Sequence, residues 1–545
     1  MGSAILVLMI KKLSVLLPLA VLILFCLLFL FRAIGNIITI PLHDYDEAHR
    51  AEGARNMVQE GFFLAPLVGS PYYQNAKISF PYSFDDTKTL YAQTGRPPLV
   101  FNLMAASITL FGDYEWAYRL PSLVFGLAAF AAIILGLYFL AQKKPKLLPL
   151  LIALLAIITS YDWWLSAQMA HLDTAVSLFT FLAVFLLLVF AQNKNKLFLA
   201  LTSFSLALAI LSKGQPAVIF LPPLIYLLII KKVSLKESLV LLASTLIILL
   251  PWVISFDCQL GPGSWLRTYA GGYLTSPSST KIGGGDPTQA APIFWYLRWW
   301  FDSFRPGIFL FGAFFLFDLV KKRLSWPKIA LLTYILAGFG LFSYAKSKVW
   351  WYVLPIIPAV SIYLYLSITD YLKERKHGLI NLSLAILFAS LPLFLWRTNT
   401  ISLSYGLITI TLIFLLLNWQ LGNWVLIRNL KLEIRNLLLV LALVASLGLF
   451  CLRFPSPSPI HPETKTVGQF FQTLPYPKCL WVEEDFPYEA ILFYSRVGEL
   501  KYFAGSESLD PDCQNYLIAD KDLENFDLVY QSGPVRLYQL FITNY

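Results

Sequence analysis

The residues best suited to chemistry are four carboxylates crowded into a short segment near the start of the chain. Residues 43–52 read HDYDEAHRAE and place Asp44, Asp46, Glu47 and Glu52 within nine positions. A well-placed carboxylate takes the proton of a hydroxyl nucleophile and so acts as a general base. Acids in the first turn of a helix also offset its dipole, which is the alternative interpretation of this cluster. Helical spacing over 46–58 predicts that Asp46 and Arg50 share one face.

The composition indicates which elements hold this segment. Hydrophobic residues make up 57% of the 545 residues and charged residues 14%, whereas a soluble domain carries about 25% charged residues. Lipid must therefore be the main solvent, which excludes a soluble multidomain enzyme or a disordered chain. Five cysteines without a C-x-x-C pair argue against a zinc ribbon or a disulfide-rich scaffold.

Hydropathy predicts about thirteen transmembrane helices, since each crossing needs about 20 mostly apolar residues. They run near 13–33, 119–141, 146–161, 172–191, 197–212, 216–230, 237–256, 306–320, 329–345, 352–369, 378–396, 401–425 and 436–453. Residues 1–453 are thus expected to form a transmembrane domain. Its two long loops, at about 34–118 and 257–305, fall on the same side as the C-terminus.

Lysine and arginine are unevenly divided between the two sides. One set of segments, including the N-terminus, holds 20 of them, and the short loops opposite hold Lys213, Lys346, Lys348 and Arg397. The positive-inside rule places the first set in the cytoplasm, and the excess indicates membrane topology and no nucleic-acid partner. The three lysines depart from the rule. A phosphate ligand would explain them, and snorkelling anchors are the alternative.

Residues 454–545 have a different character, with 6 Lys and Arg against 13 Asp and Glu, and a PSPSP linker at 455–459. We expect a small extracytoplasmic α/β domain with a helix at 464–474, a strand at 479–483, a helix at 487–496, a strand at 515–519 and a hairpin at 527–541. Cys479 and Cys513 lie in this domain, on the oxidising side of the membrane. The sequence leaves open whether they form a disulfide or remain two free thiols.

Short motifs in the membrane domain carry a family resemblance. They are the acidic pair at 46–47, GRPPL at 95–99, FG at 111–112, YRLPS at 118–122, AHLDT at 170–174, LSKG at 211–214 and SKVWWYVLP at 347–355. In this order they resemble the membrane glycosyltransferases of the C-type (GT-C) fold. The nearest likeness is to aminoarabinose transferases that act on lipid A and to protein O-mannosyltransferases, over about residues 13–370.

The resemblance implies a reaction and its carboxylates. Such enzymes take a sugar from a polyprenyl-phosphate donor, whose tail stays in the bilayer, and pass it to a lipid, protein or glycan acceptor. Asp46 matches the first acid of the family's Asp-Glu pair and is implied to be the general base, with Asp44 as its rival. Glu47 matches the second acid and is expected to support the structure or the polar network of the site. Asp173 matches the acid of the AHLDT motif and is expected to hold the acceptor or a metal.

The resemblance also implies the cations that stabilise the departing phosphate. The residues expected to bind the donor phosphate are Arg96, Lys213, Lys348, Lys346, Arg50 and Tyr352. Arg96 occupies the position of the lysine in the family's Lys-Pro-Pro-Leu segment. Tyr352 matches a family tyrosine near the donor site.

A divalent metal is the one cofactor that the resemblance raises. The glutamate that precedes Lys-Pro-Pro in aminoarabinose transferases is a candidate metal ligand, and Gly95 stands in its place here. Asp173 remains the candidate ligand, with Asp85, Asp86 or Glu47 as alternatives among which the sequence does not select. His49 and His171 are interpreted as ordinary hydrogen-bonding residues.

The sequence therefore predicts an α-helical polytopic protein of the plasma (inner) membrane, in contact with membrane lipids and with its C-terminal domain outside. The predicted activity is glycosyl transfer from a polyprenyl-phosphate sugar. A lipid or polysaccharide transporter that breaks no bond is the alternative, and a membrane assembly factor is a third interpretation.

Overall fold

The computed structural model describes residues 27, 30–42, 46–68, 79–85, 88–93, 96–141, 146–158, 160–266, 296, 305–344, 350–374, 462–475, 478–483, 489–496, 501–503, 513–523 and 526–540. The spans predicted at 378–396, 401–425 and 436–453, most of 13–33, and the domain boundary at 453/454 lie outside these residues. So do Asp44, Lys346 and Lys348.

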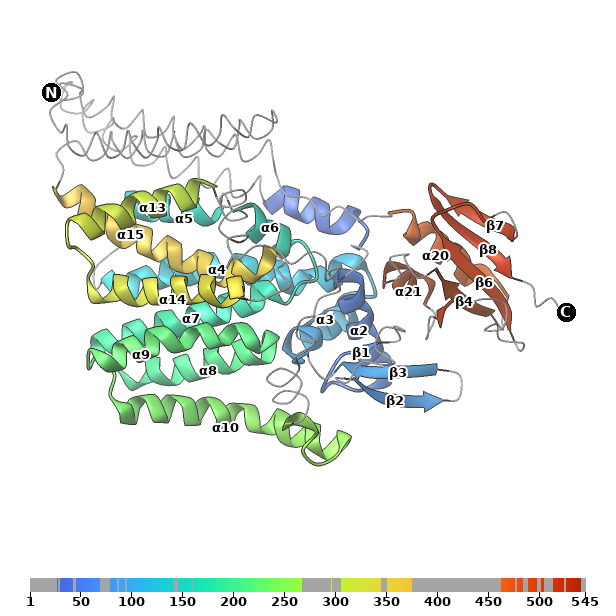
Figure 1. Cartoon of the computed structure of the whole chain (residues 1–545), viewed down its shortest axis with the longest axis horizontal. Coiled ribbons are helices and arrows are strands. Elements are labelled where there is room, and N and C mark those ends of the chain that lie inside the picture. The colour runs from blue at the N-terminus through green and yellow to red at the C-terminus, as the bar shows by residue number, and fades with distance from the viewer. Residues whose placement is uncertain are drawn as a thin grey trace, which may run out of the picture.

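Apolar helices lie side by side in a bundle that makes up most of the described chain (Figure 1). They are α4 (Glu115–Ala141), α5 (Leu147–Ile158), α6 (Tyr161–Ala167), α7 (Asp173–Asn193), α8 (Lys196–Lys213), α9 (Leu221–Ile229), α10 (Leu235–Leu260), α13 (Arg305–Val320), α14 (Trp326–Tyr344) and α15 (Ile357–Glu374). Two 3₁₀ helices, η2 (Gln215–Phe220) and η5 (Trp350–Ile356), lead into α9 and α15.

The bundle has the character of a helical membrane protein. Within the described ranges, six helices are long and apolar enough to cross a membrane, and the bent pair α5–α6 would make seven. The apolar window of α7 is 83% buried, whereas that of α10, at the edge of the bundle, is only 28% buried. Exposed side chains such as Leu246 and Ile247 on α10 therefore need lipid around them.

The predicted spans between 119 and 369 coincide with these helices to within about five residues at each end. Three of them are less regular than hydropathy indicated. The span at 146–161 is bent by 64° between α5 and α6, and those at 216–230 and 352–369 open with η2 and η5. Pro216 and Pro355 lie in these 3₁₀ turns and lack the N–H that a regular α-helical ladder requires.

A mixed group of elements covers one end of the bundle (Figure 1). It comprises α2 (Asp46–Glu60), β1 (Leu67–Val68), β2 (Ser79–Asp85), β3 (Lys88–Gln93) and α3 (Leu99–Phe111). The strands form an antiparallel sheet in the order β1-β3-β2, which was not predicted from the sequence. Although α2 is polar in sequence, its residues 47–57 are buried, because α3, β1 and the C-terminal domain pack around it.

The C-terminal region forms a small mixed sheet with two helices, as predicted. Its elements are α20 (Thr464–Thr473), β4 (Lys478–Val482), α21 (Glu489–Ser495), β5 (Lys501–Tyr502), β6 (Gln514–Ala519), β7 (Asp527–Ser532) and β8 (Val535–Leu540). The strand order is β5-β4-β6-β8-β7, with β4 parallel to both of its neighbours. A disulfide joins Cys479 to Cys513 and ties β4 to the start of β6, which resolves the alternative left open by the sequence.

Candidate active site

Asp46 is the first residue of α2. Its Oδ2 lies 2.7 Å from an Nη of Arg50 one turn later, so the two side chains share a helix face as their spacing predicted. The Arg50 side chain is 3% exposed and that of Asp46 is 39% exposed. The arginine is therefore fixed within the protein, while the carboxylate remains accessible to a ligand.

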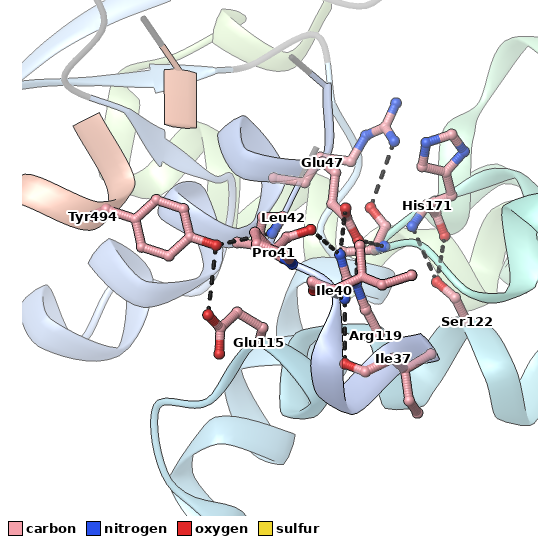
Figure 2. Close-up of polar contacts among 12 residues, drawn as sticks. Ile37, Ile40, Pro41, Leu42, Glu47, Glu115, Arg119, Ser122, His171 and Tyr494 are labelled. Atoms are coloured by element: carbon pink, nitrogen blue, oxygen red, sulfur yellow. Dashed lines mark hydrogen bonds and ion pairs between the residues drawn. The ribbon is translucent and has the colours of Figure 1, made fainter. Parts of the chain in front are cut away.

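Glu47 points the other way, into the protein (Figure 2). Its carboxylate forms a bidentate pair with Arg119 of α4, at 2.7 Å and 2.9 Å, and both side chains are fully buried. The same guanidinium donates to the carbonyls of Ile37, Ile40 and Pro41. Because its five donors form a rigid fork, Arg119 fixes the backbone before α2 and the first turn of α2 together.

The turn between α6 and α7 is joined to the same network. The backbone N–H of Ala170 donates to Glu47 Oε1 at 2.8 Å, and Ser122 Oγ donates to the carbonyl of His171 at 2.9 Å (Figure 2). The His171 ring contacts Ser166 through Nδ1 and lies edge-on to Trp351, with ring centroids 5.0 Å apart. These contacts fix the approach to Asp173, the first residue of α7.

Asp173 and Lys213 form an ion pair across two helices. Lys213 Nζ lies 2.5 Å from Asp173 Oδ1, and the side chains are 9% and 1% exposed. The lysine is the last residue of α8, which ends there because Gly214 has a φ of +75°, a conformation that favours glycine. Its Nζ also lies 4.7 Å from the ring centroid of Tyr352, a cation–π contact with η5.

The second oxygen of Asp173 has an unusual environment. Oδ2 is buried, and none of the described residues forms a hydrogen bond with it. An unsatisfied buried carboxylate oxygen is costly and calls for an explanation such as a ligand. A sugar or acceptor hydroxyl would satisfy this oxygen.

The electrostatics at Asp46 show that these segments converge. Burial by itself would raise the pKa of Asp46, but Arg50, Arg96, His171 and Lys213 outweigh it and hold the pKa well below its ordinary range. The two arginines and the lysine come from three separate segments, α2, the turn before α3 and the end of α8, and His171 comes from the turn before α7. Asp46 is thus ionised at neutral pH within a cationic surrounding.

The structure brings together most of the predicted site residues. Asp46, Arg50, Arg96, Asp173, Lys213 and Tyr352 are all linked by ion pairs, cation–π contacts or electrostatic interaction. Glu47 is next to this group but directed into the network of Arg119. Lys346, Lys348 and the rival base Asp44 lie outside the described residues.

Sequence reasoning missed the residues that hold this group in place. Arg119 and Ser122 belong to the YRLPS motif, but no role was assigned to them. The signal that was available is a lone arginine near the start of an apolar span, which needs a buried partner. The partner, Glu47, is 72 positions away and could not be selected from the sequence.

The described residues do not form a metal site. No three side chains of His, Cys, Asp or Glu gather among them into a group suited to a metal ion. Asp173, the candidate ligand, is paired with a lysine instead.

Comparison with known proteins supports the resemblance. The model of the family described as dolichyl-phosphate-mannose-protein mannosyltransferase matches residues 95–255, which include the turn before α3 and the helices α4, α7 and α8. No curated protein matches the chain. The predicted resemblance, and the lipid-linked-sugar glycosyltransferase class that it implies, are confirmed by this family match.

Solved structures define the fold. The apo structure of ArnT from Cupriavidus metallidurans matches with a TM-score of 0.62 and 14% identity, covering 96% of this chain and 98% of ArnT. ArnT from the same organism bound to undecaprenyl phosphate matches with a TM-score of 0.62 and 14% identity, covering 95% and 97%. The chain is therefore an integral membrane protein with the ArnT-like architecture of GT-C glycosyltransferases, as predicted.

Proposed function

We propose that this protein transfers a sugar from a polyprenyl-phosphate donor to an acceptor at the outer face of the membrane. The observation that carries the proposal is the convergence of Arg50, Arg96 and Lys213 on one accessible carboxylate, Asp46. Three cations face two carboxylates, Asp46 and Asp173, so the group favours an anion such as a phosphodiester. ArnT, which shares the fold, has been solved with undecaprenyl phosphate bound.

In the proposed reaction, Asp46 acts on the acceptor. The acceptor oxygen attacks the anomeric carbon and passes its proton to Asp46, while the bond from this carbon to the phosphate oxygen breaks and its electron pair stays on the phosphate. A carboxylate with a lowered pKa is a weak base in the empty site. Donor binding corrects this, because Arg50 and Lys213 then share their charge with the phosphate and the pKa of Asp46 rises.

The leaving group is stabilised by the cations. As the sugar departs, negative charge on the phosphate increases, and Arg50, Arg96 and Lys213 are held ready to offset it without reorganisation. We assign Lys346, Lys348 and the hydroxyl of Tyr352 to the same phosphate, as the motif order implies. Asp173, through its unbonded Oδ2, is proposed to accept a hydrogen bond from a sugar or acceptor hydroxyl.

Glu47 is proposed to position the site. Its carboxylate accepts three hydrogen bonds, two from Arg119 and one from the N–H of Ala170, and its side chain is fully buried, so it is not accessible to a substrate. Its pairing aligns α2 with the turn before α7, and hence Asp46 with Asp173. With the site outside, the N-terminus is cytoplasmic and residues 454–545 form the exported domain.

The test is a transfer assay with purified protein in lipid. Polyprenyl-phosphate sugars are supplied with membrane extract as acceptor, with and without chelator, and release of polyprenyl phosphate is measured. Asp46→Asn should lower the rate by about 10²–10⁴-fold, the usual contribution of general base catalysis.

Asp370→Asn is the matched control. Asp370 is also an ion-paired aspartate, 32% exposed against 39% for Asp46, but it lies at the far end of α15 from Tyr352. Its variant should retain the parental rate. Release that is equal in both variants would overturn Asp46 as the base. No release by the folded parental protein would overturn the transferase, and sugar-lipid movement without cleavage would then establish the transporter.

A further inference from the structure

The C-terminal domain contributes to the core that holds the active-site helix. Ala490, Phe493 and Tyr494 of α21 are at most 6% exposed and belong to one buried cluster with residues of α2, α3 and the start of α7. This cluster includes Ala48, directly after the acidic pair. The helix that begins with Asp46 is thus packed by α3 and β1 and, from the C-terminal domain, by α21.

A polar contact fixes the middle of α2 to the same element. Arg55 donates to the carbonyl of Phe493 at 2.7 Å, and its guanidinium lies 4.6 Å from the centre of the Phe493 ring. Arg55 is 5% exposed, so this contact is made away from water, where a charged hydrogen bond has its largest effect.

A second polar contact fixes the chain just before α2. The hydroxyl of Tyr494 accepts from the backbone N–H of Leu42 at 2.8 Å and donates to Glu115 at 3.5 Å (Figure 2). Leu42 is 1% exposed and stands four residues before Asp46. Arg119 holds the carbonyls of Ile40 and Pro41 from the bundle, so residues 40–42 are held from both domains.

Further contacts hold α21 against this end of the bundle. Arg496 pairs with Asp113 at 2.6 Å, and Lys465 of α20 pairs with Glu115. Behind α21, Gly468 allows α20 to approach closely, since a Cβ there would lie 2.7 Å from Cβ of Tyr494. The domain is therefore anchored through residues outside its own sheet.

We infer that the C-terminal domain helps to position the active site. In this inference Tyr494 is a positioning residue that fixes residues 40–42, the segment that leads to Asp46. The inference rests on the proposed function for its catalytic consequence, but its structural content does not. Removing the hydroxyl leaves the buried N–H of Leu42 without its acceptor and frees residues 40–42 on one side. Asp46 then samples positions away from the acceptor oxygen, which lowers the rate of the chemical step.

The experiment compares Tyr494→Phe with Tyr538→Phe. Tyr538 is a matched control, because its buried hydroxyl also accepts from a backbone N–H, that of Leu523 at 3.2 Å, yet its partners lie within the C-terminal domain. Tyr494→Phe should lower kcat about ten-fold, with KM for the donor within two-fold, and should speed amide hydrogen exchange over residues 46–60. Tyr538→Phe should leave kcat and that exchange within two-fold of the parent.

A charge swap supplies rescue. Arg496→Glu, at a side chain 48% exposed, should loosen the docking and lower kcat, and adding Asp113→Lys should restore part of it, because Asp113 also accepts from the hydroxyl of Tyr118. Unchanged kcat in Tyr494→Phe, or equal losses in both tyrosine variants, would overturn the inference. If the parental protein transfers no sugar, the proposed function fails, but amide hydrogen exchange over residues 46–60 still tests the positioning role of Tyr494. Equal protection of these amides in the parent and in Tyr494→Phe would overturn that role.

Discussion

Two buried carboxylate–lysine groups in this protein differ in one informative respect. In the first, Asp318 of α13 bonds to Lys328 through Oδ1 at 2.8 Å and accepts from Tyr363 and Ser367 through Oδ2. In the second, Asp173 bonds to Lys213 through Oδ1, while Oδ2 has no hydrogen-bond partner among the described residues. Both carboxylate oxygens of Asp318 therefore have hydrogen-bond partners, whereas only one oxygen of Asp173 has a partner among the described residues.

Charge distinguishes the two groups as well. Lys328 is shared between Asp318 and Asp370, so that two carboxylates face it, with Lys373 beside Asp370. Around Asp46 and Asp173 there are three cations, and one of them, Arg96, comes from a turn rather than a helix. A saturated, charge-balanced network ties helices together. An unsaturated network with excess positive charge is suited to an anionic ligand.

The largest effect should follow from breaking the complete group. Lys328→Met leaves Asp318 buried without its cation, and removing one member of a buried pair costs about 3–5 kcal/mol. We expect a marked fall in the thermal unfolding temperature in detergent and no change in the affinity of the folded protein for undecaprenyl phosphate. Parental thermal stability in this variant would contradict the structural role.

The same substitution at the second group should mainly change ligand affinity. Lys213→Met removes a proposed phosphate contact and should weaken binding of undecaprenyl phosphate by about 10–100-fold, the equivalent of about 1.4–2.7 kcal/mol. Titration with the lipid phosphate, following intrinsic tryptophan fluorescence, measures the affinity. Affinity equal to that of Lys328→Met would mean that the lysine is an anchor and not a ligand.

The smallest effect concerns pH. The pKa of Asp46 is lowered in the folded protein. At pH values above the ordinary pKa of 3.8 the carboxylate is charged and contributes fully to stability. As the pH falls through the lowered pKa, the carboxylate is protonated, and its charge and its contribution to stability are lost. Arg50→Gln removes a neighbouring cation, so the pKa of Asp46 should rise and the acid limb of kcat/KM should move to higher pH.

Lys196→Gln, at the opposite end of α8 from Lys213, is the control for this measurement. It should leave the acid limb where it is in the parent. An unmoved limb in Arg50→Gln would show that another group, and not Asp46, controls the activity at low pH.

Much of the membrane architecture follows from local sequence. Hydropathy placed the helices between 115 and 374 because each must satisfy its own backbone hydrogen bonds in lipid, which makes length and apolarity sufficient signals. The strands at 79–93 escaped prediction because β2 and β3 pair with each other and with β1, and such pairing depends on partners outside each segment. The same reason explains the unpredicted short strand β5.

The candidate site divides in the same way. Asp46 and Arg50 are four residues apart on a helix, so their ion pair could be anticipated from sequence. The pair of Asp173 with Lys213 is separated by 40 positions and depends on how α7 and α8 pack. Motif order indicated that both residues belong to one site, but it contained no information on which carboxylate would meet which cation.

The sequence by itself determined that this protein requires a lipid environment, where its apolar helices lie along the chain, and which residue types are available for chemistry. These depend on composition and on spacing within a single element. Only the tertiary structure decided that Glu47 pairs with Arg119, that Asp173 retains an unbonded oxygen, and that α21 packs against the helix of Asp46. Such outcomes depend on contacts between residues up to 452 positions apart, and the geometry of packing selects one partner from many that are chemically equivalent.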